Sequence, residues 1–267
     1  MAKQFHYEVK EIAPDTFLVN EFFSTMFVLC GTKRALVIDC GTGVGDFRSV
    51  VESITSLPYD VAMTHTHVDH VGGRGQFSEI YTSETDKKFI KEVTLFQRKG
   101  FVLTNKPMNN YSGLKIEKVA TEPRVKTLRE NDVFDLGDRT VRVISTPGHT
   151  LGSISFLDEK NRTIYIGDVA NEFLFMFLPH CTTIDEMIKT HEKLLGDDRY
   201  DTVWSSHHTE PNTKEDIKKY YEGAKRLASK KNIPLPIILI HDYKGAKLIY
   251  RPSIIHSKRR RKPSGKS

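Results

Sequence analysis

The stretch that most constrains this chain is the run Thr-His-Thr-His-Val-Asp-His at positions 64–70. It follows the apolar run 61–63, which indicates a short buried strand that ends in a loop. Its histidines and aspartate fall at relative positions i, i+2, i+4 and i+5, so they do not share one face of a helix. In extended backbone His65 and His67 point the same way, and Asp69 and His70 can face a second point across the turn. Neutral imidazoles and a carboxylate suit Zn²⁺ or Fe²⁺, and their crowding predicts two metal ions.

Three later strand ends also deliver chemistry-bearing side chains to loops. A strand predicted at 140–144 runs into the turn Ser-Thr-Pro-Gly-His-Thr-Leu-Gly-Ser, which presents His149 at its apex. A hairpin predicted from 154–157 and 163–166 ends at Asp168, and a strand at 200–204 is followed by Ser-Ser-His-His. Alone, each would be an ordinary turn or capping residue.

A glycine-rich loop, Asp-Cys-Gly-Thr-Gly-Val-Gly at 39–45, links a predicted strand at 34–38 to a predicted helix at 46–56. Its glycine spacing differs from the dinucleotide-binding fingerprint, and it lacks the lysine of a P-loop. We interpret the loop as a structural turn that lets strand and helix pack closely, rather than as a phosphate cradle.

The runs His-x-His-x-Asp-His at 65–70 and Thr-Pro-Gly-His-Thr-x-Gly-Ser at 146–153 resemble the signature of the metallo-β-lactamase superfamily, in its glyoxalase II-like branch. The resemblance covers about residues 10 to 250. It implies an α/β (α+β) fold, a four-layer αβ/βα sandwich in which two mixed β-sheets are flanked by helices. It also implies a dinuclear site at one sheet edge. In that site the first metal would be bound by His65, His67 and His149, the second by Asp69, His70 and His207, and both by Asp168.

The same resemblance assigns further roles. Asp39, in the superfamily's Asp-x-Gly, would orient a metal ligand from behind. His207 is the ligand when the strand 201–204 is matched with that of the family, with the adjacent His208 as the alternative. The ions, expected to be Zn²⁺ with iron or manganese as alternatives, would acidify a bridging water whose hydroxide attacks the substrate. Asp69 would bind metal and also orient the nucleophile or pass a proton to the leaving group.

The resemblance narrows the substrate only in part. β-Lactamases of the superfamily carry cysteine or histidine where Asp168 stands, and its flavoproteins carry glutamate where His67 stands. The full ligand set is kept by thioester hydrolases of the glyoxalase II type, by lactonases and by several phosphodiesterases. We predict hydrolysis of a thioester, ester or lactone carbonyl in a small-molecule substrate. The alternatives are a phosphodiesterase or nuclease acting on nucleic acid or a nucleotide, a β-lactamase-like side activity, and a persulfide dioxygenase with mononuclear iron.

The segment 171–180 is unusually aromatic and follows Asp168 directly. Its Phe173, Phe175, Phe177 and His180 either belong to the core or wall an apolar substrate pocket. The sequence alone leaves both interpretations open.

Composition predicts one domain over residues 1–256 and a disordered basic tail over 257–267. The chain has 267 residues, 38% of them apolar and 28% charged, as in ordinary globular proteins. Three widely spaced cysteines fit reduced thiols, and neither a signal peptide nor an apolar run of membrane-spanning length occurs, so we expect a cytoplasmic enzyme without membrane contact. The tail holds six basic residues and no acid, which would allow contact with nucleic acid or anionic lipid. The oligomeric state is left open.

Overall fold

The structure, a computed structural model, describes residues 7–104, 116, 118–171 and 173–257. The first part of the chain forms a seven-stranded sheet in the order β1-β2-β3-β4-β5-β6-β7. Its strands are Glu8–Ala13, Thr16–Asn20, Thr25–Cys30, Ala35–Ile38, Tyr59–Ala62, Glu79–Ser83 and Arg124–Leu128. Strands β1 to β4 form the antiparallel meander that the sequence predicts, and β4 to β7 run parallel. Parallel neighbours need crossover connections, which the helices α1 (Phe47–Ile54) and α2 (Val68–Val71) help to supply.

A second sheet of five strands has the order β13-β11-β10-β9-β8. In chain order its strands are β8 Val133–Asp135, β9 Thr140–Ser145, β10 Ile154–Asp158, β11 Thr163–Tyr165 and β13 Thr202–Trp204. Strands β8 to β11 pair antiparallel, whereas β13 returns parallel to β11. The ends of β9, β11 and β13 lead into the loops that carry the later candidate ligands.

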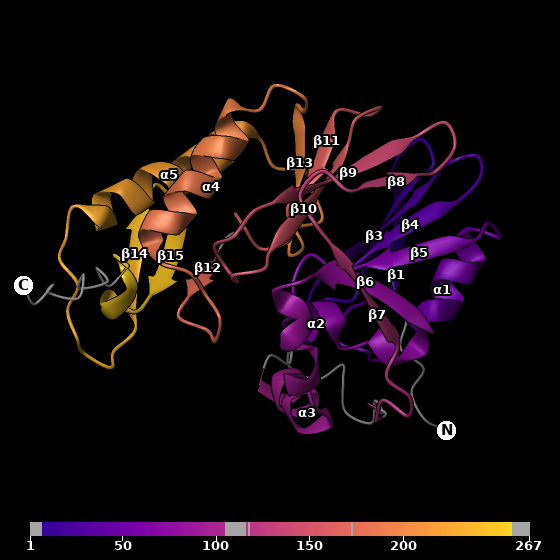
Figure 1. The fold of residues 1–267 in the computed structure, drawn as a ribbon, viewed down its shortest axis with the longest axis horizontal. Helices are drawn as coiled ribbons and strands as arrows, with labels where there is room; N and C mark the ends of the chain where they lie inside the picture. Colours follow the sequence, from indigo (N-terminus) through magenta and orange to yellow (C-terminus); the bar gives the residue numbers. More distant parts are fainter. Residues whose placement is uncertain (1–6, 105–115, 117, 172, 258–267) are drawn as a thin grey trace, which may run out of the picture.

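The two sheets face each other over an apolar core, with helices outside (Figure 1). Phe27 of the first sheet packs on Tyr165 of the second, with ring centroids 4.7 Å apart. Helix α1 covers the outer face of the first sheet through Phe47 and Val51. The helices α4 (Ile184–Gly196) and α5 (Lys214–Ala228) cover the second sheet. The predicted αβ/βα layering is confirmed.

A third sheet is the main departure from the predicted two. Within the described residues, β12 (Phe173–Met176), β15 (Ala246–Tyr250) and β14 (Leu239–Tyr243) form a small sheet beside the sandwich (Figure 1). The turn Asp-Tyr-Lys-Gly between apolar segments at 236–241 and 246–250 predicts the β14–β15 hairpin. The parallel pairing of β12 with β15 was not predicted, because it joins segments about seventy residues apart. This pairing arises because α5 packs on β14 and β15, while Leu174 and Met176 of β12 enter the same core.

Apolar residues at helical spacing predict one helix over residues 84–98, but the structure differs there. The chain there forms the short 3₁₀ turns Asp86–Lys88 and Ile90–Glu92, followed by α3 (Leu95–Thr104). Thr94 begins the true helix, because its Oγ1 accepts a hydrogen bond from the N–H of Gln97. Two further 3₁₀ turns span Arg74–Gln76 and Pro252–Ile254.

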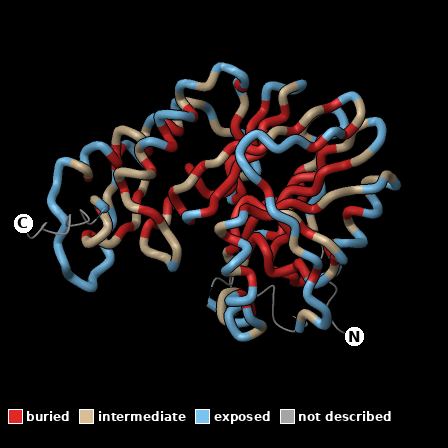
Figure 2. Tube along the Cα trace, in the orientation of Figure 1, coloured by how far each residue is buried: buried red, intermediate tan, exposed pale blue. Residues whose placement is uncertain are grey.

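Burial follows the layers (Figure 2). Buried backbone concentrates in the two facing sheets, whereas the connection between α5 and β14 is exposed. No helix of the described residues is long and apolar enough to cross a membrane. The basic tail, apart from Ser257, lies outside the described residues.

Candidate metal centre and active-site cavity

Four loops that follow strand ends meet at one edge of the sandwich. The segment after β5 carries residues 64–70, of which 68–70 begin α2, and the loops after β9, β11 and β13 carry His149, Asp168 and His207. The strands behind them are largely buried, so the backbone is held rigidly up to each loop. The structure therefore brings together side chains that lie far apart in the sequence.

One group consists of His65, His67 and His149, whose ligand nitrogens lie within 4.8 Å of one another. Nδ1 of His67 lies 2.7 Å from Nε2 of His149. Three imidazoles on this small radius can hold one metal ion.

A second group consists of Asp69, His70 and His207, again within 4.8 Å. Asp168 lies between the two groups, because its Oδ2 is 3.1 Å from Nε2 of His207 and 3.5 Å from Nε2 of His149. Asp168 is thus the carboxylate that can reach both groups. His208 instead points its Nδ1 at Oδ1 of Asn212, 2.9 Å away.

The ring nitrogens that face away from the centre are fixed by hydrogen-bond acceptors. Nδ1 of His149 lies 2.9 Å from the carbonyl oxygen of Phe175, and Nδ1 of His207 lies 2.7 Å from that of Phe23. A carbonyl oxygen only accepts, so each Nδ1 carries the proton and each Nε2 turns a lone pair inward. Such outer partners orient metal-binding histidines.

Electrostatics keep the first group neutral. Burial lowers the pKa of His65 well below its ordinary value, that of His67 to about 4 and that of His149 to about 3, and the neighbouring imidazoles add to the effect. At neutral pH these rings are uncharged, which is the state that binds metal.

The second group is different because it contains acids. Burial alone would lower the pKa of His70, but the carboxylates of Asp69, Asp168 and Asp39 raise it well above its ordinary value. Burial opposes ionisation of Asp168, yet His207 and His70 hold its pKa well below the usual range. The carboxylates thus attract positive charge into this part of the site.

Unpaired polar atoms show that the residues fit a metal. Among the described residues, Nε2 of His65 and His70 and Oδ1 of Asp168 are buried without a hydrogen-bond partner. Leaving such atoms unpaired costs about 1–3 kcal/mol each. Ligation by divalent metal ions would satisfy all three.

Asp39 holds the ligand-bearing segment 64–70 in place through hydrogen bonds. Its Oδ1 accepts a 2.7 Å hydrogen bond from the N–H of Thr64, and its Oδ2 lies 2.9 Å from Nδ1 of His70. The neighbouring glycine-rich loop wraps around the buried carboxylate of Glu21, which accepts from the N–H groups of Thr42 and Val44. The loop amides bind this internal carboxylate, so the loop is built as a structural turn.

Two supporting residues could not be found by motif. Oδ2 of Asp86 accepts from the N–H of Thr66 at 3.1 Å and from Oγ1 of Thr150 at 3.0 Å. It thereby joins the loop of the first motif to the turn of the second. Behind Asp168, Nε2 of buried His191 lies 2.9 Å from the carbonyl oxygen of Val169. Their sequence signal is weak, because an isolated acid or histidine in a helical segment is usually structural.

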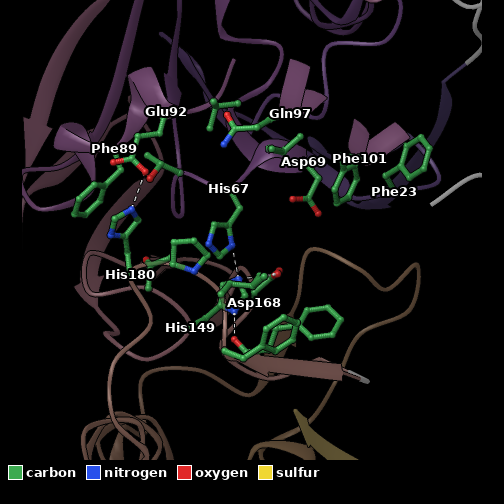
Figure 3. A pocket seen from close by; sticks show the side chains of 18 of the residues that line it. Phe23, His67, Asp69, Phe89, Glu92, Gln97, Phe101, His149, Asp168 and His180 are labelled. Carbon is green, nitrogen blue, oxygen red and sulfur yellow. Dashed lines mark hydrogen bonds and ion pairs between the residues drawn. The ribbon is translucent and has the colours of Figure 1, made fainter. Parts of the chain in front are cut away.

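A cavity of ≈ 620 Å³ opens directly onto these ligands. Figure 3 shows side chains of the N-terminal half (purple ribbon) and of the C-terminal half (brown ribbon) on opposite sides of it. Phe23 and Phe101 lie at one end, with ring centroids 5.7 Å apart, and Phe89 stacks on His180 at the other. Oε2 of Glu92 lies 2.9 Å from Nε2 of His180 beside that stack.

Alternate side chains of the aromatic segment 171–180 face opposite sides of strand β12 and so have different roles. Phe175, Phe177 and His180 line the cavity, whereas Leu174 and Met176 face the core. Phe173, expected in the pocket wall with them, is not among the lining residues. It shares a face with Phe175 but lies nearer the start of β12, where its side chain is 38% exposed and carries Lys247 over its ring.

An αβ/βα sandwich with histidines and aspartates gathered at its strand ends defines a metal-dependent hydrolase. The chain belongs to the metallo-beta-lactamase superfamily, whose sequence model matches residues 19–207.

Curated relatives include thioester-cleaving enzymes. The chain is 24% identical over 212 residues to the human acyl-coenzyme A thioesterase MBLAC2, which covers 71% of this chain and 75% of that protein. It is 25% identical over 174 residues to the hydroxyacylglutathione hydrolase of Bdellovibrio bacteriovorus, covering 63% and 54%. Among solved structures, the DIM-1 metallo-beta-lactamase matches with a TM-score of 0.61 at 14% identity, over 85% of this chain and 99% of the other. At that identity the likeness concerns the fold alone.

Proposed function

We propose that this hydrolase cleaves acyl thioesters with the help of two divalent metal ions, and Zn²⁺ is the metal we expect. The observation that carries the proposal is the chemistry of the cavity wall. Six phenylalanines line it, namely Phe22, Phe23, Phe89, Phe101, Phe175 and Phe177, and none of the described lining residues is lysine or arginine. An apolar acyl group gains free energy by leaving water for such a wall.

The same wall disfavours the alternatives. Enzymes that act on phosphodiesters or nucleic acids bind phosphate through arginine, lysine or backbone N–H groups. The described wall offers no lysine or arginine to a reacting phosphate, and Glu92, which is not one of the ligand residues, would repel one. The two thioester-cleaving relatives support an acyl carbonyl as the point of attack.

The ligand residues divide into the two groups of the site. His65, His67 and His149 would hold one ion, Asp69, His70 and His207 the other, and Asp168 would touch both. Bound divalent ions would supply Lewis acidity toward the thioester carbonyl and toward water. A thioester carbonyl suits this chemistry because it is more electrophilic than that of an ordinary ester.

Side chains of the protein would position the substrate and supply a proton to the leaving group. Asp69 lines the cavity, and its Oδ2 lies 3.5 Å from Nε2 of His207, so the carboxylate lies where it could orient the nucleophile or pass a proton to the departing sulfur. Phe175 and Phe177 exclude water from the acyl side of the cavity. Nδ1 of His149 is bonded to the carbonyl oxygen of Phe175, so β12 both supplies part of the aromatic wall and orients a metal ligand.

The decisive experiment is metal analysis of the purified protein together with a hydrolysis panel. We expect about two equivalents of metal per chain, and faster turnover of acyl-coenzyme A thioesters than of a lactone, a phosphodiester or a β-lactam. Lengthening the acyl chain should lower KM until the cavity is filled. Preference for the phosphodiester or the β-lactam, or trace metal after metal-replete expression, would refute the proposal.

A matched pair of variants connects the activity with the centre. Asp168→Asn should abolish thioester hydrolysis while leaving one ion bound by the three histidines. Asp201→Asn replaces an exposed aspartate that pairs with Arg162, and it should behave like the parent protein. Equal activity of the two variants would show that Asp168 does not serve the reaction.

A further inference from the structure

The C-terminal part of the chain combines exposed apolar side chains with a one-sided charge. Residues 223–267 contain thirteen lysines and arginines and a single acid, Asp242, whereas the whole chain has 40 basic and 34 acidic residues. The remaining chain therefore holds 27 basic and 33 acidic residues and is net negative. The basic charge of this protein is concentrated in its last 45 residues.

Within that basic region lies an apolar run, Ile-Pro-Leu-Pro-Ile-Ile-Leu-Ile at 233–240, which leads from α5 into β14. Its large side chains face solvent: Ile238 is 52% exposed and Ile240 66%, and Ile233, Leu235, Ile237 and Leu239 are 37–49% exposed. Figure 2 shows this connection as exposed backbone at the end of the molecule that holds the C-terminus. Contiguous exposed apolar residues of this kind mark an interaction surface.

The sheet register extends the apolar surface toward the cavity. Ile240 of β14 pairs with Ile249 of β15, which pairs with Phe175 of β12, so the three side chains share one face of the small sheet. The opposite face is covered by α5 through residues such as Leu248 and Tyr250. Since Phe175 also lines the cavity, the apolar row runs from the cavity wall to the exposed edge.

A basic group lies on the same face as this row, because the ammonium of Lys247 lies 4.5 Å from the ring centroid of Phe173, and Lys247 alternates with Leu248 as Ile249 does. Further basic groups stand at the end of β14, where Arg226 of α5 and Lys244 lie 4.5 Å and 5.3 Å from the ring centroid of Tyr243. His256 is bonded to Asn232, whose Nδ2 donates to the His256 carbonyl at 2.9 Å. This bond fixes the last described turn of the chain directly beside the apolar run.

We propose that the run 233–240, the open face of the β14–β15–β12 sheet and the basic residues around them form a surface that binds anionic lipid membranes from the side. Isoleucine and leucine side chains would enter the interface between headgroups and acyl chains, while lysines and arginines contact the anionic headgroups. The sequence predicts no membrane contact, but surface binding requires no membrane-spanning helix.

Charge selects this occupant over two others. A second copy of the chain would bring the same excess of positive charge against itself, which opposes pairing through this face. A nucleic acid would meet the basic residues, but it has no use for six exposed aliphatic side chains, because bases are bound by aromatic stacking and hydrogen bonds. An anionic bilayer complements both the charge and the apolar run.

Vesicle sedimentation of the full chain tests the proposal without any substrate, so the result is independent of thioester hydrolysis. The protein should bind vesicles of equal parts phosphatidylcholine and phosphatidylserine, bind pure phosphatidylcholine vesicles far less, and release with added salt. Ile238→Ser with Ile240→Ser should weaken binding about tenfold or more. The matched control, Val9→Ser with Val133→Ser, also removes two exposed apolar side chains, each 46% exposed, and should bind like the parent.

Melting temperature and metal content verify that the variants are folded, and Lys230→Ser with Lys231→Ser provides a second arm that keeps every isoleucine. This variant should lose part of its preference for phosphatidylserine. Absence of binding to anionic vesicles would overturn the proposal, as would equal binding by the isoleucine variant and its control. A dimer that forms through Ile238 and Ile240 without vesicle binding would overturn the proposal and assign the surface to a second copy of the chain. Binding of a labelled oligonucleotide in place of vesicles would overturn it in favour of a nucleic acid.

Discussion

Oδ2 of Asp39 lies 2.9 Å from Nδ1 of His70, and both side chains are fully buried. The same carboxylate accepts from the N–H and the hydroxyl of Thr64, so it fixes the start of the metal loop and one of its ligands together. Asp39 itself adopts φ 64°, a left-handed conformation that aspartate tolerates better than most residues. The strand end is therefore shaped to aim this carboxylate at the loop.

Asp39→Ala should destabilise the protein and weaken metal binding. It leaves Nδ1 of His70 and the N–H of Thr64 buried without an acceptor, which we expect to cost about 3–5 kcal/mol of unfolding free energy. Metal affinity should fall about 10–100-fold, since His70 loses its orientation. Denaturant unfolding of the metal-free protein and competition with a chelator measure the two effects separately. Asp138→Asn, at an exposed pair with Lys160, serves as the control, and wild-type metal affinity in Asp39→Ala would contradict the assignment.

The pair His207 and His208 gives a second test. His207→Ala should remove one of two bound ions, because Nε2 of His207 faces Asp69 and Asp168. His208→Ala removes a ring that contacts Asn212, so it should keep both ions and most of the activity. Metal content by elemental analysis decides between them. The reverse result would move the ligand by one residue.

Local signals explain what the sequence could predict. Apolar runs that end in Pro-Gly or Gly-Asp turns identify strand ends such as those at His149 and Asp168, and the meander β1 to β4 follows from short turns between neighbours. These features depend only on residues close in the chain. The strand ends and the meander could thus be predicted from the residues themselves, whereas the layering and the gathering of the motif residues were expected from the resemblance to the superfamily.

Long-range packing explains what was missed. The pairing of β12 with β15 depends on how α4 and α5 fill the space beside the second sheet. Asp86 and Glu21 act on loops distant in sequence, and neither lies in a motif. An isolated acidic residue can be solvated, cap a helix or accept hydrogen bonds from a loop, so only the folded structure shows which loop it holds.

Glu21 predicts a pH dependence of stability. Burial raises its pKa from 4.5 to about 8, although hydrogen bonds from Thr42 and Val44 oppose the shift. The folded state thus holds this proton more tightly than the unfolded state. The favourable contribution of Glu21 is complete below pH 4.5 and is lost as the pH rises through about 8, a change of roughly 4–5 kcal/mol.

Glu21→Gln has no proton to lose, so its stability relative to the parent should rise across this pH range. Denaturant unfolding in the presence of chelator measures the difference without a contribution from metal. Glu84→Gln, at a side chain that is 65% exposed, should show no such trend. A constant difference between Glu21→Gln and the parent would mean that Glu21 does not titrate there.

Gly152 and Gly100 form the last matched pair. A Cβ at Gly152 would lie 2.2 Å from Oδ1 of Asp86 and 2.4 Å from Oγ of Ser83, whereas a Cβ at Gly100 in α3 meets nothing within 4 Å. Gly152→Ala must therefore displace Asp86, which we expect to cost about 1–3 kcal/mol. Gly100→Ala should instead stabilise the protein by about 0.5–1 kcal/mol, because alanine favours a helix interior.

Metal affinity separates a local clash from a role of Asp86 in the site. Asp86 joins the loops of His65 and His149 through Thr66 and Thr150, so its displacement should spread the three histidines of the first group. We expect Gly152→Ala to bind its first ion about tenfold more weakly, the order of loss for an outer partner of metal ligands. Gly100→Ala should bind it unchanged. If Gly152→Ala lost stability but kept its metal affinity, Asp86 would be a structural tether alone, because the ligand loops would then keep their spacing without it.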